Sequence, residues 1–180
     1  KKKRLQKIKK GTIDLNGKKY NYSINKFDSK NISFKLFLIQ IENLLDTENV
    51  YGYNNETFRY IGFQKALLDW ITKEDLAFDV IHCHDHHTSL IPFFIKHCSD
   101  YQHLQDTPTV LTIHNAQYQG QFSHENLDLL PQFDFGNVGL LDWYGSVNPL
   151  AAGIKCATKV NTVSPTYMEE LKESACGLEG

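Results

Sequence analysis

Residues 79–88 gather the side chains of this chain that are best suited to chemistry. Within six positions they supply four histidines and one aspartate: His82, His84, Asp85, His86 and His87. A histidine can exchange a proton or bind a metal near neutral pH, and a neighbouring carboxylate can orient its ring. A short apolar run precedes the cluster, and an apolar, helix-like stretch follows it. This order predicts a strand, a polar turn and a helix, with the cluster at the strand end where open α/β sheets bind ligands.

Zinc-dependent hydrolysis is one chemistry that this cluster could perform. In a strand, His82 and His84 would point to one face and Cys83 to the other, so the two histidines could chelate a metal together. The familiar metallo-hydrolase order is His-x-His-x-Asp-His, and Asp85 comes one position too early for it. The two histidines could equally be satisfied residues at the end of a sheet. Both interpretations stay open at this point.

A second polar segment follows the strand-like run 109–113 and should face the same edge of the sheet. Its amides and aromatic hydroxyl offer donors and acceptors for sugar hydroxyls, and its ring offers a stacking face. These residues are His114, Asn115, Tyr118 and Gln119. A third segment covers residues 163–167, for which helix capping by Ser164-Pro165 is a sufficient explanation. The chain contains no Gly-x-Ser-x-Gly elbow, P-loop or Gly-x-Gly-x-x-Gly pattern.

The first part of the chain predicts a hairpin, a strand and a helix. Asn16-Gly17 lies between two alternating runs and predicts a β-hairpin, because both residues tolerate a positive φ. Residues 34–41 form an apolar run typical of a strand that is buried on both faces. Residues 58–71 have helical spacing, with one apolar face made by Phe63, Leu67, Trp70 and Ile71.

Strands and helices alternate in the rest of the chain. Apolar runs predict strands at 78–83, 109–113 and 159–163 and helices at 88–98, 148–157 and 164–173, with Gly177 as a stop. Residues 116–146 have no clean period and predict a long irregular or partly helical excursion. This alternation predicts an α/β fold with a mostly parallel sheet flanked by helices, and a β-hairpin near the start.

Composition and charge argue against several classes of protein. The net charge of -2 is unlike that of a general nucleic-acid binder, and the basic run at residues 1–10 predicts a solvated arm, or alternatively a polyanion-binding tail. No apolar stretch reaches the roughly 18 residues that would cross a membrane, and the start lacks the apolar core of a signal peptide. The 4 cysteines are widely spaced, which indicates reduced, buried thiols in a cytoplasmic protein.

In order and spacing, these motifs resemble the bacterial glycogen synthase and plant starch synthase family. Residues 79–88 resemble its Asp-Val-(Val/Ile)-His-x-His-Asp-Trp-His-(Thr/Ala) segment, and residues 111–120 its Thr-(Ile/Val)-His-Asn-x-x-Tyr-Gln-Gly loop. Residues 157–167 are similar to its Ala-Asp-x-Val-x-Thr-Val-Ser-Pro-(Thr/Ser)-Tyr segment, and residues 177–180 to its Gly-(Leu/Met)-Glu-Gly end. The resemblance covers about residues 11–180.

The resemblance implies a GT-B glycosyltransferase, in which two Rossmann-like domains enclose the active site. The implied reaction transfers glucose from ADP-glucose to the non-reducing end of an α-1,4-glucan such as glycogen, with retention and without a metal or other cofactor. His87 matches the histidine that contacts the transferred sugar, and Asp85 is expected to orient the turn that presents it. The segment of His114, Asn115, Tyr118 and Gln119 matches the loop on the sugar and acceptor side.

The chain departs from the family pattern in two residues and in its extent. His86 stands where the family usually has Trp, and Asn55 stands where an acid that helps to position the sugar usually precedes an Arg-aromatic pair, here Arg59-Tyr60. We expect residues 1–180 to be part of an N-terminal GT-B domain that lacks the first strand, with its Lys-x-Gly-Gly loop, and the whole C-terminal domain. A glucan-binding module without catalysis is the other alternative, because aromatic and amide residues are frequent between 115 and 144.

Overall fold

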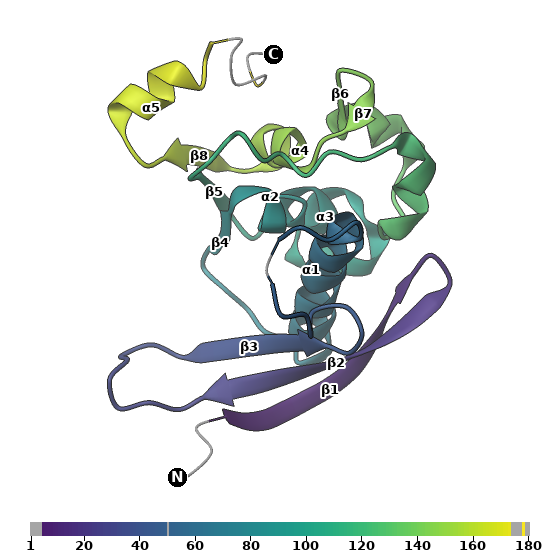
Figure 1. Cartoon of the computed structure of the whole chain (residues 1–180), viewed down its shortest axis with the longest axis vertical. Helices are drawn as coiled ribbons and strands as arrows, with labels where there is room; N and C mark the ends of the chain where they lie inside the picture. Colours follow the sequence, from purple (N-terminus) through teal and green to yellow (C-terminus); the bar gives the residue numbers. More distant parts are fainter. Residues whose placement is uncertain (1–4, 50, 174–177, 179–180) are drawn as a thin grey trace. The chain divides into compact units, whose positions relative to one another are not determined.

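The computed structural model describes residues 5–49, 51–173 and 178, which fall into two compact units, Lys1–Leu76 and Ala77–Gly180 (Figure 1). The first unit is an antiparallel sheet of strands β1 (Leu5–Leu15), β2 (Lys18–Phe27) and β3 (Leu36–Ile41), in that order, with helix α1 (Glu56–Lys73) packed on β1 and β3. The second is built around a parallel sheet. The prediction that residues 1–180 belong to one larger domain stays a prediction.

The predicted hairpin is confirmed, and its turn explains its geometry. Asn16 and Gly17 have φ values of 52° and 73°, which is the pair of left-handed residues that a two-residue hairpin turn requires. The basic run at residues 1–10 was predicted to be a solvated arm. Residues 5–10 are mostly exposed, but they extend β1 and pair with β2, so the prediction of a free arm is wrong for them; residues 1–4 lie outside the described residues. The prediction that residues 34–41 form a strand buried on both faces was also wrong for β3. This strand pairs with β2 at one edge of this sheet and leaves Leu38 43% exposed, so it is not buried on both faces.

Helix α1 confirms the predicted helix and shows which residues hold it to its sheet. Trp70 and Ile71 are buried as predicted, whereas Phe63 and Leu67 are only half-buried. The buried face is completed by Ile61, Gln64, Ala66 and Leu68. The buried guanidinium of Arg59 donates hydrogen bonds to Leu44 O and to Thr47 Oγ1, so it fixes the segment between β3 and α1.

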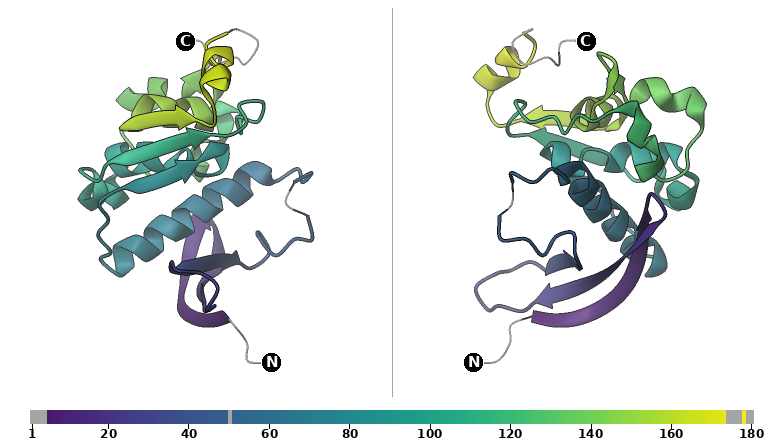
Figure 2. Two further views of the ribbon diagram at one scale, coloured as in Figure 1. Left: turned by 90° about the vertical axis from the view of Figure 1, so that its left-hand side faces the viewer. Right: turned by 45° about the vertical axis from the view of Figure 1, so that its right-hand side comes forward.

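The second unit contains the predicted parallel sheet, with β4 (Ile81–His84), β5 (Thr109–Ile113) and β8 (Lys159–Thr162) side by side in that order (Figure 2). The short helix α2 (Asp85–Thr88) follows β4 directly. Helix α3 (Ile91–His97) begins after two intervening residues, and Pro92 lies in the first turn of α3, where proline is tolerated. Helix α4 (Pro149–Cys156) precedes β8, and α5 (Pro165–Glu170) follows it. The expected α/β fold is confirmed.

The core of this unit lies between α3, α4 and the Cys83–Leu111 face of the sheet. Phe93, Phe94 and Leu150 are fully buried there. Gly153 allows α4 to approach closely, since a Cβ at this position would lie 2.7 Å from Ser89 O and 2.9 Å from Leu111 Cδ2. The close approach fixes the turn that follows α2, and so the position of the histidine cluster.

The excursion predicted for residues 116–146 contains short regular pieces. Two 3-10 helices, η2 (His124–Leu129) and η3 (Phe135–Leu140), are followed by a small antiparallel hairpin of β6 (Asp142–Trp143) and β7 (Ser146–Val147). A third 3-10 helix, η1 (Ser99–Leu104), packs against α3. Among the described helices, none is long and apolar enough to cross a membrane. Cys83, Cys98 and Cys156 are buried free thiols, as predicted, and Cys176 and Gly177 lie outside the described residues.

Candidate active site

Parallel pairing brings the ends of β4 and β5 together. His84, the last residue of β4, is in register with Thr112, so Asp85 and His114 follow at the same edge of the sheet. The Nδ1 atom of His84 lies 3.0 Å from Nε2 of His114. One of these nitrogens must carry the shared hydrogen and the other must accept it. The two polar segments therefore meet, as the predicted strand order requires.

A row of hydrogen bonds crosses all three strands beside this pair. His82 Nε2 lies 2.7 Å from Thr112 Oγ1, and that hydroxyl donates a 2.6 Å hydrogen bond to Asn161 Oδ1. Because a hydroxyl has one hydrogen to donate, Thr112 must accept from His82, and His82 must carry its hydrogen on Nε2. His82 is thus a satisfied histidine of the sheet face.

No group of three or more His, Cys, Asp or Glu among the described residues is arranged to hold a metal ion. The rings of His82 and His84 contact each other with centroids 4.2 Å apart and planes tilted by 36°, and Nε2 of His82 is occupied by Thr112. His86 is buried, so its ring is not directed to solvent beside the others. The zinc interpretation of residues 82–87 therefore has no support in the part of the chain that the structure describes.

Asp85 joins the turn after β4 to the loop after β5. Its Oδ1 atom accepts hydrogen bonds from the backbone N–H groups of His114, at 2.7 Å, and Asn115, at 3.2 Å. Its φ of 52° turns the chain sharply from the strand into α2, so its backbone shapes the turn that carries His87. Its carboxylate is directed to the loop and not to that turn, a contact that the sequence did not predict.

His86 and His87 lie together on α2, under the far end of the same loop. Their ring centroids are 3.9 Å apart. Gly120 packs on His86, since a Cβ at Gly120 would lie 2.9 Å from His86 Cδ2, and its φ of 74° favours glycine in any case. His86, at the position where the family usually has Trp, therefore packs against the end of this loop.

Two further residues hold the loop from α4 and α5. The Tyr167 hydroxyl accepts a 2.8 Å hydrogen bond from Ala116 N, and Asn148 Nδ2 donates a 2.6 Å hydrogen bond to Gln119 Oε1. Asn148 also caps α4 by accepting from Ala151 N. Residues at α2, α4 and α5 thus contact residues 114–120 and fix their position. Residues 114–120 are called the β5 loop.

Partial desolvation and the neighbouring histidines disfavour a protonated His84. Desolvation is the main cause that lowers the pKa of His84 below its ordinary value of 6.5, and His82 and His114 lower it further, while Asp85 acts in the opposite direction. Near neutral pH His84 is therefore held in its neutral form, which can share a hydrogen with His114.

The sequence profile of the starch synthase catalytic domain matches residues 1–180. The chain belongs to the starch synthase catalytic domain family. The glycogen synthase of Flavobacterium johnsoniae is 45% identical over 169 residues, which cover 94% of this chain and 36% of that protein. The glycogen synthase of Thermodesulfovibrio yellowstonii is 39% identical over 160 residues, covering 81% of this chain and 31% of that protein. The chain thus spans about a third of the length of these relatives.

A solved structure shares the fold. The catalytic domain of starch synthase IV from Arabidopsis thaliana, bound to ADP and acarbose, superposes with a TM-score of 0.78. It is 23% identical in sequence, and the match covers 99% of this chain and 38% of that domain. At this identity the likeness shows the fold alone.

In this member of the starch synthase family, the predicted site residues differ in which side-chain atoms are left available to bind a ligand. Tyr118 is 59% exposed, and Asn115 uses only its Oδ1, which accepts from Gln117 N, so its Nδ2 has no hydrogen bond to the described residues. Gln119 uses both ends of its amide within the protein, because Nε2 donates to Ala116 O and Oε1 accepts from Asn148. Asn55 precedes α1 in the other unit, where its side chain is exposed and does not cap the helix.

Sequence reasoning missed Asn148 and Tyr167 as supports of this site. Asn148 had a local signal, since asparagine before proline is typical of a helix start. Tyr167 had none that points to Ala116, because the two residues lie 51 positions apart and meet only in the folded chain.

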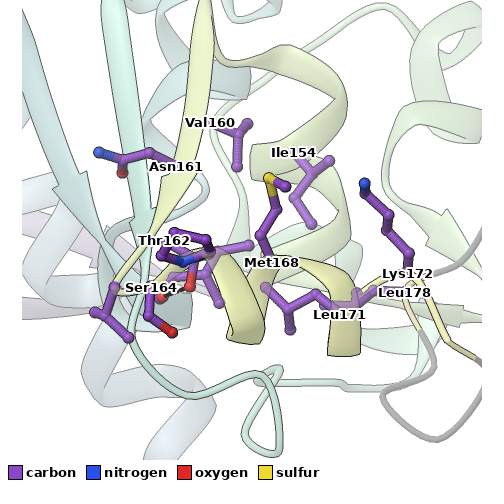
Figure 3. Close-up of a pocket in the computed structure, with 12 residues that line it drawn as sticks. Ile154, Val160, Asn161, Thr162, Ser164, Met168, Leu171, Lys172 and Leu178 are labelled. Atoms are coloured by element: carbon purple, nitrogen blue, oxygen red, sulfur yellow. Dashed lines mark hydrogen bonds between the residues drawn. The ribbon is translucent and has the colours of Figure 1, made fainter.

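A pocket of about 720 Å³ lies between β8, α4 and α5 and holds none of the predicted site residues (Figure 3). Aliphatic and thioether side chains make up most of its wall, including Ile154, Val160, Met168 and Leu171, with Asn161 and Ser164 among its polar residues. Such a lining offers few partners for sugar hydroxyls, so the polar edge at β4 and β5 is the better candidate site.

Proposed function

We propose that this chain is part of a glycogen synthase, which transfers glucose from ADP-glucose to the non-reducing end of an α-1,4-glucan with retention. Membership of the starch synthase family and the named function of its relatives support this proposal. The ADP and acarbose bound to the Arabidopsis enzyme support a nucleotide sugar donor and a glucan acceptor. The donor is a substrate, and we propose no cofactor. We also propose a cytoplasmic location and no nucleic-acid or membrane partner.

The observation that carries this proposal is the role of Asp85, which connects the turn into α2, the helix of His87, to the β5 loop. That carboxylate accepts from two consecutive amides of the β5 loop, at 2.7 and 3.2 Å, while its backbone makes the turn into α2. One residue thereby sets the position of the proposed sugar-contacting histidine and of the proposed acceptor loop together. Transfer between two sugars needs this alignment, because reacting groups held in register avoid the entropy cost of meeting.

The proposed roles of His87 and Asn55 rest on the resemblance, and those of the β5 loop residues follow from which of their atoms are available. His87 contacts the transferred sugar and stabilises developing charge, and it does not act as a general base. Asn115 Nδ2 and the face of Tyr118 are exposed and meet the acceptor, whereas Gln119 holds the β5 loop through its internal hydrogen bonds. Asn55 lies at the position where the family's acid helps to hold the sugar, and we propose a neutral contact there.

We propose that residues 1–180 form part of the N-terminal domain and do not catalyse alone. The chain spans about a third of the length of its relatives. In the resembled family, an Arg-Lys pair of the C-terminal domain stabilises the diphosphate leaving group, and that domain is not part of residues 1–180. Electrostatic stabilisation of the leaving group is the largest contribution expected for such a transfer. Turnover by residues 1–180 alone would contradict this assignment.

The experiment measures transfer of radiolabelled glucose from ADP-glucose to glycogen by the complete gene product, its His87→Ala variant and a His103→Ala control. His103 is an exposed histidine of η1 outside the proposed site, so its removal should leave the rate unchanged. We expect His87→Ala to lower kcat by about 100-fold or more, the range for loss of one transition-state contact. A rate within a few-fold of the wild type would remove His87 from the mechanism.

Glycogen binding and zinc content, measured on the same protein, separate the alternative functions. Glycogen binding without any transfer by the folded protein would identify a glucan-binding module. Absence of both, with stoichiometric zinc in protein prepared without chelator, would restore the hydrolase interpretation of residues 82–87.

A further inference from the structure

A β-bulge in β1 places two lysines on the same face of the first sheet. Lys7 is opposite Asn25 and Lys10 is opposite Ser23, so the two pairs are three positions apart in β1 but only two in β2. The bulge inserts the extra residue between them. Because side chains alternate along a strand, Lys7 and Lys10 would point to opposite faces without the bulge, and with it they point to the face of Ser23.

A hollow of about 330 Å³ lies on this face, within the first unit, and both lysines line it. Its polar lining also includes Thr12, Asn21, Ser23 and Glu42. The face is turned away from α1, because Tyr22, next to Ser23 in β2, donates its hydroxyl hydrogen to Asp69 of that helix. The volume is in the range of sites that bind small molecules. This hollow is called the β1–β2 hollow.

One end of the β1–β2 hollow holds polar groups that lack partners. Lys7 and Lys10 form no ion pair or hydrogen bond with another described residue, whereas Lys9, on the other face, pairs with Glu74. Ser23 is only 7% exposed, and its Oγ accepts from Asn25 Nδ2 at 3.2 Å but donates to no described residue. A buried hydroxyl hydrogen without an acceptor, beside two unpaired ammonium groups, indicates an anionic partner with oxygen atoms.

The other end of the β1–β2 hollow has the opposite charge. Glu42 accepts a 3.4 Å hydrogen bond from Asn21 Nδ2, and Thr12 Oγ1 donates to Asn21 Oδ1 at 3.3 Å. Ser23 and Asn21 follow one another on this face, so the cationic end and the acidic end are separated along β2. A carboxylate repels a phosphate but accepts hydrogen bonds from hydroxyl groups. The partner should therefore carry an anion at one end and hydroxyls at the other.

We propose that the β1–β2 hollow binds a phosphorylated polyol, with its phosphate at the two lysines and Ser23 and its hydroxyls at Asn21 and Glu42. Lysine binds phosphate as a point charge, and Ser23 donates its hydroxyl hydrogen to a phosphate oxygen. Glu42 distinguishes this ligand from inorganic phosphate, which has no hydroxyl chain to reach it. The hollow contains none of the residues of the candidate active site, so this inference does not depend on the proposed function.

The test is calorimetric titration of the complete gene product with sorbitol 6-phosphate and with inorganic phosphate. Sorbitol 6-phosphate has neither the pyranose ring nor the nucleotide of the proposed substrates. We expect the wild type to bind it more tightly than inorganic phosphate. Lys7→Gln and Lys10→Gln should each raise the Kd of both compounds about three- to fivefold, as loss of one exposed ion pair would. Both lysines are exposed, so these variants should melt at the wild-type temperature.

Two further variants complete the test. Lys19→Gln is the matched control, because Lys19 is an exposed lysine of β2 outside the hollow, and its removal should change neither Kd. Glu42→Ala removes the acceptor for the hydroxyls, so it should abolish the preference for sorbitol 6-phosphate over inorganic phosphate.

Four results would overturn the proposal. They are no binding of either compound, an unchanged Kd in Lys7→Gln and Lys10→Gln, an equal rise in Lys19→Gln, and a preference for sorbitol 6-phosphate that persists in Glu42→Ala. Equal affinity of the wild type for both compounds would identify inorganic phosphate as the ligand and overturn the role given to Glu42.

Discussion

Substitution of Asp85 separates the two tasks that the structure gives this residue. Its carboxylate accepts from the N–H groups of His114 and Asn115, and its backbone has a φ of 52°. Asp85→Asn keeps an acceptor and tolerates this φ. Asp85→Gly keeps only the backbone freedom. Asp85→Ala loses both the acceptor and a residue type that suits the left-handed region.

The structure sets the expected order of the three changes. Hydrogen bonds to a charged acceptor contribute about 1.5–3 kcal/mol each, and water can replace them in part because His114 and Asn115 are exposed, so we assign about 2 kcal/mol to the pair. Alanine adds about 1 kcal/mol for its left-handed conformation. The β5 loop should thus lose about 1 kcal/mol in Asp85→Asn, 2 in Asp85→Gly and 3 in Asp85→Ala.

Amide hydrogen exchange of residues 112–121 measures this directly. Each 1.4 kcal/mol changes an opening equilibrium tenfold, so exchange of this segment should accelerate by about fivefold, thirtyfold and more than a hundredfold in that order. Asp134→Ala is the control, because Asp134 caps Gly136 N at 2.9 Å in η3 and should affect only its own segment. Equal exchange in all three Asp85 variants would refute the reasoning, since neither the charge nor the φ would then matter.

Three further predictions concern the supports of the same site. Gly120→Ala should destabilise the protein by about 2 kcal/mol or more, seen as a lower melting temperature, because its φ is 74° and its Cβ would lie 2.9 Å from His86 Cδ2. Tyr167→Phe should cost about 1–2 kcal/mol in urea unfolding, because the buried Ala116 N loses its acceptor, and an unchanged midpoint would contradict this contact. The lowered pKa of His84 means that the unfolded state binds a proton more readily, so stability should be full above pH 6.5 and fall as the pH drops below it. The melting temperature of His84→Asn should decline less between pH 7.5 and 5.5 than that of the wild type, since this contribution is absent from it.

Local chemistry in the sequence predicted the elements whose cause is local. Asn16-Gly17 and Ser164-Pro165 each determine a turn or a cap within four residues, and the structure shows both, including the Ser164 side chain accepting from Tyr167 N. The alternation of apolar runs predicted the parallel sheet and the meeting of the two polar segments at its edge, because parallel strands place their carboxyl ends together.

Features that depend on distant residues could not be predicted in this way. An apolar run does not reveal whether its strand is central or at an edge, and β3 was misjudged for this reason. The contacts of Asp85 with His114 and of Tyr167 with Ala116 join positions 29 and 51 residues apart, and only the tertiary fold creates them. The left-handed φ of Tyr144 was equally invisible, since its residue type argues against it.

Because the β5 loop is ordered in the folded chain, ligand binding does not carry the entropy cost of ordering it. Ordering a backbone residue costs about 1–2 kcal/mol of conformational entropy, and a flexible loop would lose this freedom each time it closed on a ligand. Contacts from Asp85, Asn148 and Tyr167 order the loop when the chain folds. The loop is therefore ordered once, when the chain folds, and not again each time a chain end binds.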